Sequence, residues 1–173
     1  MSRRARTKDD FPNFLSGELT LSGGNAFTTN QVFTPIPRLK TIGNKATVME
    51  LLYVDLVMNS IDLLSIGDKI EFQFSIGTVQ SGILNWSDTR VFYHFDVEIG
   101  GTTTGFTTWI QPIRYQFQTN DGFGYLLASD SFRVSGDTTG MAQATIFSWK
   151  LYYRFVDIPL SEFIGIVQST QAS

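Results

Sequence analysis

The sequence predicts an all-β fold: a single-domain, eight-stranded antiparallel sandwich of two sheets, with the jelly roll as the preferred topology. Eight or nine segments alternate apolar and polar residues, which is the period of a strand with one face in a core. Clusters of Gly, Pro, Asn and Asp separate these segments. No segment is predicted to be helical. An immunoglobulin-like sandwich is less favoured, because the chain has 173 residues against about 100 for that fold and contains no Cys.

The longest predicted strand, residues 140–159, organises the rest. From Ile146 onward the apolar and polar side chains alternate: Phe147, Trp149, Leu151, Tyr153 and Phe155 against Ser148, Lys150 and Arg154. Aromatic residues favour a pleated surface over a helix. A strand of this length requires neighbours, so we expect it to lie in the centre of a sheet.

The first third of the chain supplies three predicted strands. A connector over residues 9–16 leads into a short strand at 17–22, and an extended stretch at 26–34 ends at two prolines. Proline cannot donate to a central ladder, so this stretch is expected to be an edge strand or a segment that leaves the sheet, and not a central strand. Residues 45–59 also show a helical stripe, but no capping box precedes them and β-favouring residues dominate. We predict a strand there, with both faces partly covered.

The remaining strands follow from the same alternation, which is clearest at residues 69–77. Strands are expected at 69–77, 90–99, 112–119 and 124–134, loops at 78–89 and 100–108, and turns at 62–68, 120–122 and 135–137. In the first of these strands, Ile70, Phe72 and Phe74 are predicted to face the core. After Pro159, residues 161–168 are expected to form only a short apolar segment.

Charge is unevenly distributed along the chain. Arg3, Arg4, Arg6 and Lys8 place four positive charges in the first eight residues, with no acidic residue among them. Removing these four from the thirteen Lys and Arg leaves nine against sixteen Asp and Glu, so the rest carries a formal charge of −7. A basic segment on an acidic body can reach a polyanion while the body stays soluble. A frayed, solvated terminus would explain the same charges. We divide the chain into an arm with its connector, residues 1–15, and a jelly-roll domain, residues 16–173.

No catalytic site is predicted. The one histidine, His94, lies mid-strand on the polar face, and the chain has no G-x-S-x-G elbow, so a surface histidine is expected. Asp96 and Glu98 lie two apart on the same face and could serve as a carboxylate pair of a jelly-roll glycosidase, but retaining chemistry needs carboxyl groups about 5 Å apart across a substrate groove. Two such neighbours on an exposed strand more often keep a sheet soluble. An enzyme is therefore the least favoured class.

Patterns for metal, phosphate and membrane binding are also missing from the sequence. With no Cys, no H-E-x-x-H and no D-x-D-x-D-G loop, neither a metal ion nor another cofactor is predicted. Glycine-rich residues 22–25 lack the lysine of a phosphate-binding loop. No apolar run approaches the ~20 residues that span a bilayer. The basic start is followed by no apolar signal segment, so we expect neither a membrane anchor nor a secretory signal.

The layout of the chain resembles a known family. The resemblance rests on the Arg-rich start, KATVMELLYVDL at residues 45–56, YYRFVDIP at 152–159 and EFIGIVQSTQ at 162–171. Together with the all-β body, they resemble the capsid proteins of circular Rep-encoding single-stranded DNA (CRESS-DNA) viruses, which are circovirus-like single jelly rolls. The resemblance implies a homo-oligomer: sixty copies that self-assemble into a small icosahedral shell around single-stranded DNA. It also implies a place in the virion, with assembly inside the host cell and the nucleus as a candidate compartment.

The resemblance also implies how nucleic acid is held. The basic arm would face the genome and contact its phosphates without reading sequence, through Arg3, Arg4, Arg6 and Lys8. Many relatives carry a far longer basic arm. Genome packing would therefore need further help at the inner surface, from residues such as Arg38, Lys40 or Lys45, from stacking aromatic residues, or from cations.

Exposed aromatic residues in predicted loops are the candidates for subunit contacts: Trp86, Phe106 and Trp109. Packing of the same side chains onto the sandwich is the alternative. The runner-up function is a jelly-roll binding module, either lectin-like or a trimeric receptor-binding domain. Size in solution separates the two functions, because a binding module would stop at a small oligomer.

Overall fold

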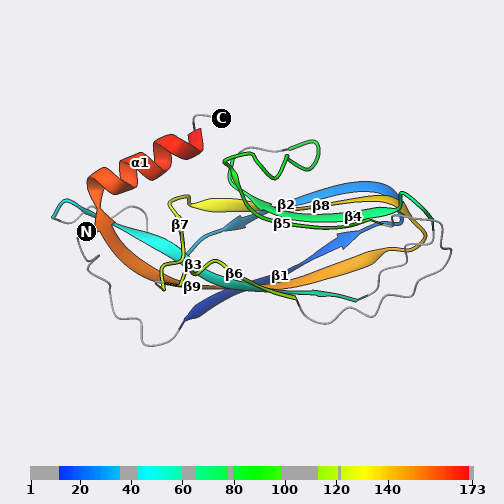
Figure 1. The fold of residues 1–173 in the computed structure, drawn as a ribbon, viewed down its shortest axis with the longest axis horizontal. Helices are drawn as coiled ribbons and strands as arrows, with labels where there is room; N and C mark the ends of the chain where they lie inside the picture. The colour runs from blue at the N-terminus through cyan, green and yellow to red at the C-terminus, as the bar shows by residue number, and fades with distance from the viewer. Residues whose placement is uncertain are drawn as a thin grey trace.

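Two antiparallel sheets pack face to face in the computed structural model, which describes residues 12–35, 43–59, 65–77, 80–98, 113–120 and 122–171 (Figure 1). The first sheet contains, in spatial order, β1 (Asn13–Leu21), β9 (Thr145–Pro159), β3 (Lys45–Met58) and β6 (Ile113–Gln116), with β7 (Tyr125–Leu127) also paired to β3. The second sheet contains β2 (Gly24–Phe33), β8 (Ser131–Met141), β4 (Lys69–Ser75) and β5 (Val91–Glu98).

The strand pairs are nested inside one another. β4 pairs with β5, β3 with β6, β2 with β8 and β1 with β9, so that one long antiparallel ribbon is folded over into two sheets. This winding is the double-sheet jelly roll, and the predicted fold class is confirmed. β9 lies between β1 and β3, as expected for the long strand, and β2 lies at a sheet edge, as expected from its prolines.

An aromatic core joins the two sheets. Phe72 of β4 stacks on Phe147 of β9 with ring centroids 4.9 Å apart, and Phe74 meets the indole of Trp149 at 5.4 Å in an edge-to-face arrangement. Such pairs each contribute about 0.5–1.5 kcal/mol beyond the burial of their area. The positions predicted to face inward on β4 and β9 are therefore those that hold the sheets together.

A second, smaller apolar cluster lies on the other face of the first sheet. The register between β3 and β9 shifts at Leu52, so the core-facing residues of β3 change from odd to even positions there. Before the shift, Val48 points away from the core and joins Val156 and Ile158 of β9. This arrangement confirms that residues 45–59 form a strand with both faces partly covered.

A helix covers this second cluster, and the prediction that the chain has no helix is wrong. α1 (Leu160–Gln171) follows Pro159, where the sequence predicts only a short apolar segment. Phe163 and Ile166 are three residues apart, which places them on one helix face, and both pack against the cluster. The backbone N–H of Leu160 donates to the carbonyl of Asn44 at 2.9 Å. Burial of this apolar face, which the sequence alone does not reveal, stabilises the helix.

The predicted turn at residues 135–137 is also wrong, because β8 continues through it as a strand. Gly136 is required there by packing and not by a turn. A Cβ atom added at Gly136 would lie 2.9 Å from side-chain carbons of both Leu19 and Leu21. The glycine therefore lets β1 and β8 approach closely across the core.

Several predicted boundaries move. The strand predicted at 124–134 divides into β7 and the start of β8, and β9 begins at Thr145 after a turn at residues 142–144. β1 begins at Asn13, inside the segment predicted to be a connector. The turn predicted at 120–122 is present, with a positive φ of 73° at Gly122, although Asp121 lies outside the described residues. The predicted loop at 100–108 also lies outside them.

Candidate interaction surface

Among the residues predicted to contact other subunits, the structure describes Trp86, which is 75% exposed. It belongs to the connection between β4 and β5. The other predicted site residues lie outside the described residues: Arg3, Arg4, Arg6, Lys8, Phe106 and Trp109. The same holds for Arg38 and Lys40, whereas Lys45 is the exposed first residue of β3.

The β4–β5 connection folds back over the outer face of the second sheet (Figure 1, green). Gln73 points away from the core but is fully buried, because this connection covers it. Its side-chain amide donates to the carbonyl of Leu84 at 2.7 Å and accepts from the N–H of Leu84 at 3.1 Å. Gln80 Nε2 donates to Ser75 Oγ at 2.8 Å. The polar face of β4 therefore fixes the connection in place.

Two overlapping turns, both starting at Asn85, enclose Trp86. Asn85 Oδ1 accepts from the N–H of Ser87 at 3.0 Å, and the N–H of Asp88 donates to the carbonyl of Asn85 at 2.9 Å. Arg90 then binds both carboxylate oxygens of Asp88, at 2.9 and 2.6 Å. Hydrogen bonds from the side chain and backbone of Arg90 lower the pKa of Asp88 to about 2. Trp86 is thus displayed on a loop that is already ordered.

Titratable side chains line the outer face of the second sheet beside this connection. Gln73 Nε2 lies 3.2 Å from His94 Nδ1, and His94 Nε2 lies 3.7 Å from Glu71 Oε1. Glu71 lies between Asp137 of β8 and Asp96 of β5. Burial raises the pKa of Asp137, and the charge of Glu71 adds to that increase. Lys69 Nζ binds Glu71 Oε1 at 2.9 Å, so the carboxylates of this face are partly neutralised.

Asp96 and Glu98, which the sequence places on the polar face of β5, are both exposed there, opposite Glu71 and Lys69. Within the described part of the chain, no group of three or more His, Cys, Asp or Glu side chains is arranged to hold a metal ion. None of the helices in that part is long and apolar enough to cross a membrane.

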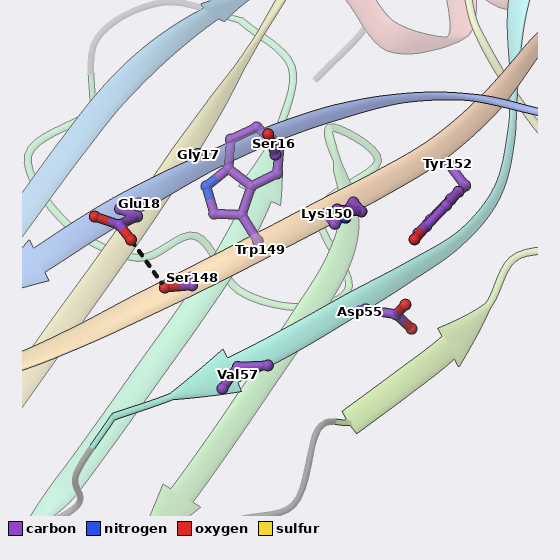
Figure 2. A pocket seen from close by; sticks show the side chains of 9 residues that line it. All are labelled: Ser16, Gly17, Glu18, Asp55, Val57, Ser148, Trp149, Lys150 and Tyr152. Carbon is purple, nitrogen blue, oxygen red and sulfur yellow. Dashed lines mark hydrogen bonds between the residues drawn. The ribbon is translucent and has the colours of Figure 1, made fainter.

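An open groove of about 490 Å³ lies on the opposite side of the molecule, across the outer faces of β1, β9 and β3 (Figure 2). We call it the β1/β9/β3 groove; its lining residues are Ser16, Gly17, Glu18, Asp55, Val57, Ser148, Trp149, Lys150 and Tyr152. The indole of Trp149 lies so close to Gly17 that an added Cβ there would be 2.7 Å from it. Glycine at this position therefore leaves space for the indole.

Three aromatic rings cross the strands at one end of this groove. Tyr53 of β3 stacks on Tyr152 of β9 with centroids 4.2 Å apart, and Phe14 of β1 lies 6.1 Å beyond Tyr152. The guanidinium of Arg114 lies 4.4 Å from the centroid of Tyr53 and donates to both carboxylate oxygens of Asp55, at 2.6 and 2.7 Å. These hydrogen bonds raise the pKa of Arg114. The rings form an ordered aromatic wall.

The groove also carries a cation with no acidic partner. Lys150 Nζ lies 4.7 Å from the ring of Phe14 and makes no ion pair within the described residues. At the other end of the groove, Ser148 Oγ donates to Glu18 at 3.2 Å (Figure 2). The sequence analysis did not identify this groove. The sequence holds only one sign of the groove, which is tyrosine at an outward position in each of two strands, Tyr53 and Tyr152. The pairing of these strands is not visible in the sequence.

The sheet topology defines the chain as a double-sheet jelly-roll protein. No protein-family model matches the chain, and no curated protein sequence matches it. Solved structures do match, among them VP1 capsid proteins of polyomaviruses.

Three of these VP1 structures illustrate the likeness. Merkel cell polyomavirus VP1, in complex with disialyllactose, matches with a TM-score of 0.56 and 9% identity, over 91% of this chain and 100% of that chain. Apo New Jersey polyomavirus VP1 matches at 0.54 and 9%, over 85% and 100%. The human polyomavirus 6 VP1 pentamer matches at 0.53 and 10%, over 91% and 98%. At these identities the likeness shows a shared fold, and fold alone does not establish function.

Proposed function

We propose that this chain is a viral coat protein, whose copies assemble into a closed icosahedral shell of sixty subunits around single-stranded DNA. The observation that carries the proposal is the complete nested jelly roll, which extends over nearly the whole of three VP1 capsid proteins. In this proposal the chain is a structural protein of the virion, assembled inside the host cell, and it carries out no reaction.

Self-assembly requires contacts on more than one face of the subunit. The sandwich presents Trp86 on one outer face and an aromatic-walled groove on the other. Aromatic residues are enriched where proteins bind one another. One of the VP1 neighbours, that of human polyomavirus 6, is itself a pentamer. Together these observations support homo-oligomerisation of this chain.

Binding of the genome is assigned to the basic arm. Arg3, Arg4, Arg6 and Lys8 carry four charges, while the rest of the chain is acidic, so attraction to phosphates is concentrated at one end of the sequence. Phosphate contacts of this kind release counterions and do not depend on base sequence. Single-stranded DNA is the cargo that the family resemblance implies.

Negative-stain electron microscopy of the purified protein, combined with its absorbance ratio at 260 and 280 nm, tests the proposal. Uniform round shells with a high ratio are expected. Empty shells would support the coat function and contradict the assignment of nucleic acid. A monomer or trimer at all salt concentrations and pH values would contradict the coat function.

Deletion of residues 2–8 separates packaging from assembly. The deleted protein is expected to form shells of the same size with less encapsidated nucleic acid, because the four arm charges are removed. Replacing the four basic residues by Gln is the matched control, since it keeps the length of the arm. Loss of shells in both variants would show that the arm forms subunit contacts instead.

A carbohydrate-binding module is the second candidate, and the Merkel cell polyomavirus VP1 complex with disialyllactose is the observation that favours it. Such a module would remain a small oligomer and would bind glycans without residues 2–8. A glycan array with the intact and deleted proteins, read beside their mass in solution, distinguishes it from the coat protein.

A further inference from the structure

One edge of the second sheet is formed by β2, which pairs within the described residues with β8 alone. In an antiparallel ladder, alternate residues of a strand direct both backbone groups to the same side. The N–H of Thr34 donates to the carbonyl of Asp130 at 2.9 Å, and that of Ala26 donates to Thr138 Oγ1 at 3.2 Å, so even positions face β8. The odd positions direct their N–H and C=O groups toward the open edge: Phe27, Thr29, Gln31 and Phe33.

This edge lacks the features that keep strands from pairing. Natural sheets protect an exposed edge with charged side chains or with proline inside the strand. The ten residues of β2 include no Lys, Arg, Asp, Glu or Pro, and no charged residue occurs anywhere in residues 19–37. β5, at the opposite edge of the same sheet, carries the exposed Asp96 and Glu98. The chain therefore protects one edge of this sheet and leaves the other able to accept a strand.

The strand that fits this edge is β2 of a second copy. A two-fold axis at Asn30 brings the two strands together antiparallel and places Phe27 opposite Phe33 and Thr29 opposite Gln31. All four residues with free backbone groups then pair with one another. Each directly opposed pair of this kind exchanges two hydrogen bonds, so the contact contains about eight backbone hydrogen bonds.

Other positions of the axis pair the strands less completely. An axis at Thr29 places Phe33 opposite Asn25, where a bulge interrupts β2. An axis at Gln31 places Phe27 opposite Pro35, which has no N–H to donate. The register centred on Asn30 is therefore the one that satisfies the free edge.

The side chains agree with the same register. Phe33 is 72% exposed in the single subunit, although it belongs to a strand. Its position opposite Phe27 of the second copy, on the outer face of the sheet, forms an aromatic cross-strand pair, and the two-fold axis creates a second such pair. Aromatic residues directly opposite each other stabilise neighbouring strands. The contact therefore covers the most exposed apolar side chain of the edge in both copies.

We propose that two copies of this chain join by antiparallel pairing of β2 with β2 about a two-fold axis at Asn30. The pairing makes one continuous sheet out of the four-stranded sheets of the two subunits. The inference rests on the proposed function, for which it supplies the two-fold contact between subunits. A contact of a surface with itself closes at two copies, so the other contacts of a shell use other surfaces.

Disulfide cross-linking tests the contact directly, since the chain has no Cys of its own. Asn30 is exposed, and on the two-fold axis it lies opposite itself in a non-hydrogen-bonded pair, where Cα atoms are about 4.5 Å apart. That distance suits a disulfide, so Asn30→Cys should give a cross-linked dimer under mild oxidation, seen on a non-reducing denaturing gel.

Gln31→Cys is the matched control, because Gln31 is the next residue and is equally exposed. In the proposed register it lies diagonally from its own copy, at about 7–8 Å, which is too far for a disulfide. No cross-link of Asn30→Cys, or equal yields from the two variants, would overturn the proposal.

Removing a backbone donor from the open edge gives a second test. Gln31→Pro removes an N–H that points away from β8, a place where an edge strand tolerates proline. Gln31→Ala is its control, because both changes remove the side-chain hydrogen bond to Ser131 and only proline removes the N–H. Added to Asn30→Cys, Gln31→Pro should slow cross-linking at least about tenfold, since each dimer loses two hydrogen bonds.

Gln31→Ala should leave the rate of cross-linking close to that of Asn30→Cys alone. Equal rates for Gln31→Pro and Gln31→Ala would contradict the pairing. Circular dichroism shows whether Gln31→Pro is folded; if it is not, the comparison of Asn30→Cys with Gln31→Cys decides.

Cross-linking and electron microscopy together separate this inference from the coat function. Shells without the Asn30→Cys cross-link would overturn the pairing of β2 and leave the coat function standing. The cross-link without shells would support the pairing and contradict the coat function. A protein that forms neither would overturn both.

Discussion

The outer faces of the two sheets are both partly covered by the chain itself, but by different means. α1 covers the first sheet with apolar side chains, placing Phe163 and Ile166 on Val156 and Ile158. The β4–β5 connection covers the second sheet through hydrogen bonds, chiefly those of Gln73. A strand residue that points away from the core can therefore be buried in two ways. It needs an apolar side chain where the helix packs on it, but it can be polar where a loop hydrogen-bonds to it.

The largest effect is expected from weakening the apolar cover. Ile158→Ala removes side-chain carbons from a fully buried site and should lower the free energy of unfolding by about 2–5 kcal/mol. Ile164→Ala on the exposed side of α1 is the control and should change it by no more than about 0.5 kcal/mol. Urea unfolding of both variants measures the difference. Equal effects would show that α1 gains nothing from this contact.

A smaller effect is expected from the polar cover. Gln73→Ala leaves the N–H and carbonyl of Leu84 without their partner, and an unsatisfied buried group costs about 1–3 kcal/mol. Hydrogen exchange at the amide of Leu84 should accelerate at the same time. Gln31→Ala, which removes an exposed hydrogen bond to Ser131, is the control. Unchanged exchange at Leu84 would mean that other contacts hold the connection.

A pH dependence should reveal the ion pair that completes this cover. The pKa of Asp88 falls from 3.8 to about 2 because Arg90 hydrogen-bonds its charged form. A lowered carboxyl pKa adds stability that is fully present above about pH 4 and is lost as the pH falls toward 2. Wild type should therefore exceed Asp88→Asn in stability at neutral pH, by a modest amount because the pair lies near the surface. The difference should shrink between pH 4 and 2 in acid unfolding curves.

The smallest effect has the opposite sign. Burial, together with the charge of Glu71, raises the pKa of Asp137, so its charged form is disfavoured in the folded state. The contribution of Asp137 to the stability is favourable below the pKa that its carboxyl has in the unfolded chain. It is lost as the pH rises through the higher pKa of the same carboxyl in the folded protein. Asp137→Asn, which keeps an acceptor for the N–H of Thr138, should stabilise the protein slightly at pH 7, by about 0.5 kcal/mol or less. The gain should vanish at about pH 3; a loss at pH 7 would contradict the assignment.

Alternation predicted the inner faces of the sheets because it reflects burial directly. Phe72, Phe74 and Phe147 are fully buried, as their positions in the sequence indicate. The pattern failed at Gly136, where a glycine between polar residues indicated a turn and instead accommodates Leu19 and Leu21. Close approach of two strands from distant parts of the chain leaves no local signal.

The outer faces could not be predicted for a related reason. Gln73 has the pattern of a solvent-facing residue and is fully buried, because a loop that begins a few residues later returns over it. The helical state of α1 depends on contact with β3 and β9, which the sequence does not display. For Trp86 the sequence left open a subunit contact or packing onto the sandwich; the side chain is 75% exposed, and its role in assembly stays a prediction.

The nesting of the strand pairs determines the order in which the two outer surfaces form during folding. β4 and β5 are neighbours along the chain, whereas β1 pairs with β9, so that Gly17 meets Trp149 only after nearly the whole chain is present. Pairing of strands so distant in sequence is slow, because a long loop must close before any contact compensates for it. During synthesis on the ribosome, β1 therefore stays unpaired with β9 until β9 has been made. We expect the groove, which needs both strands, to appear only with the last folding step.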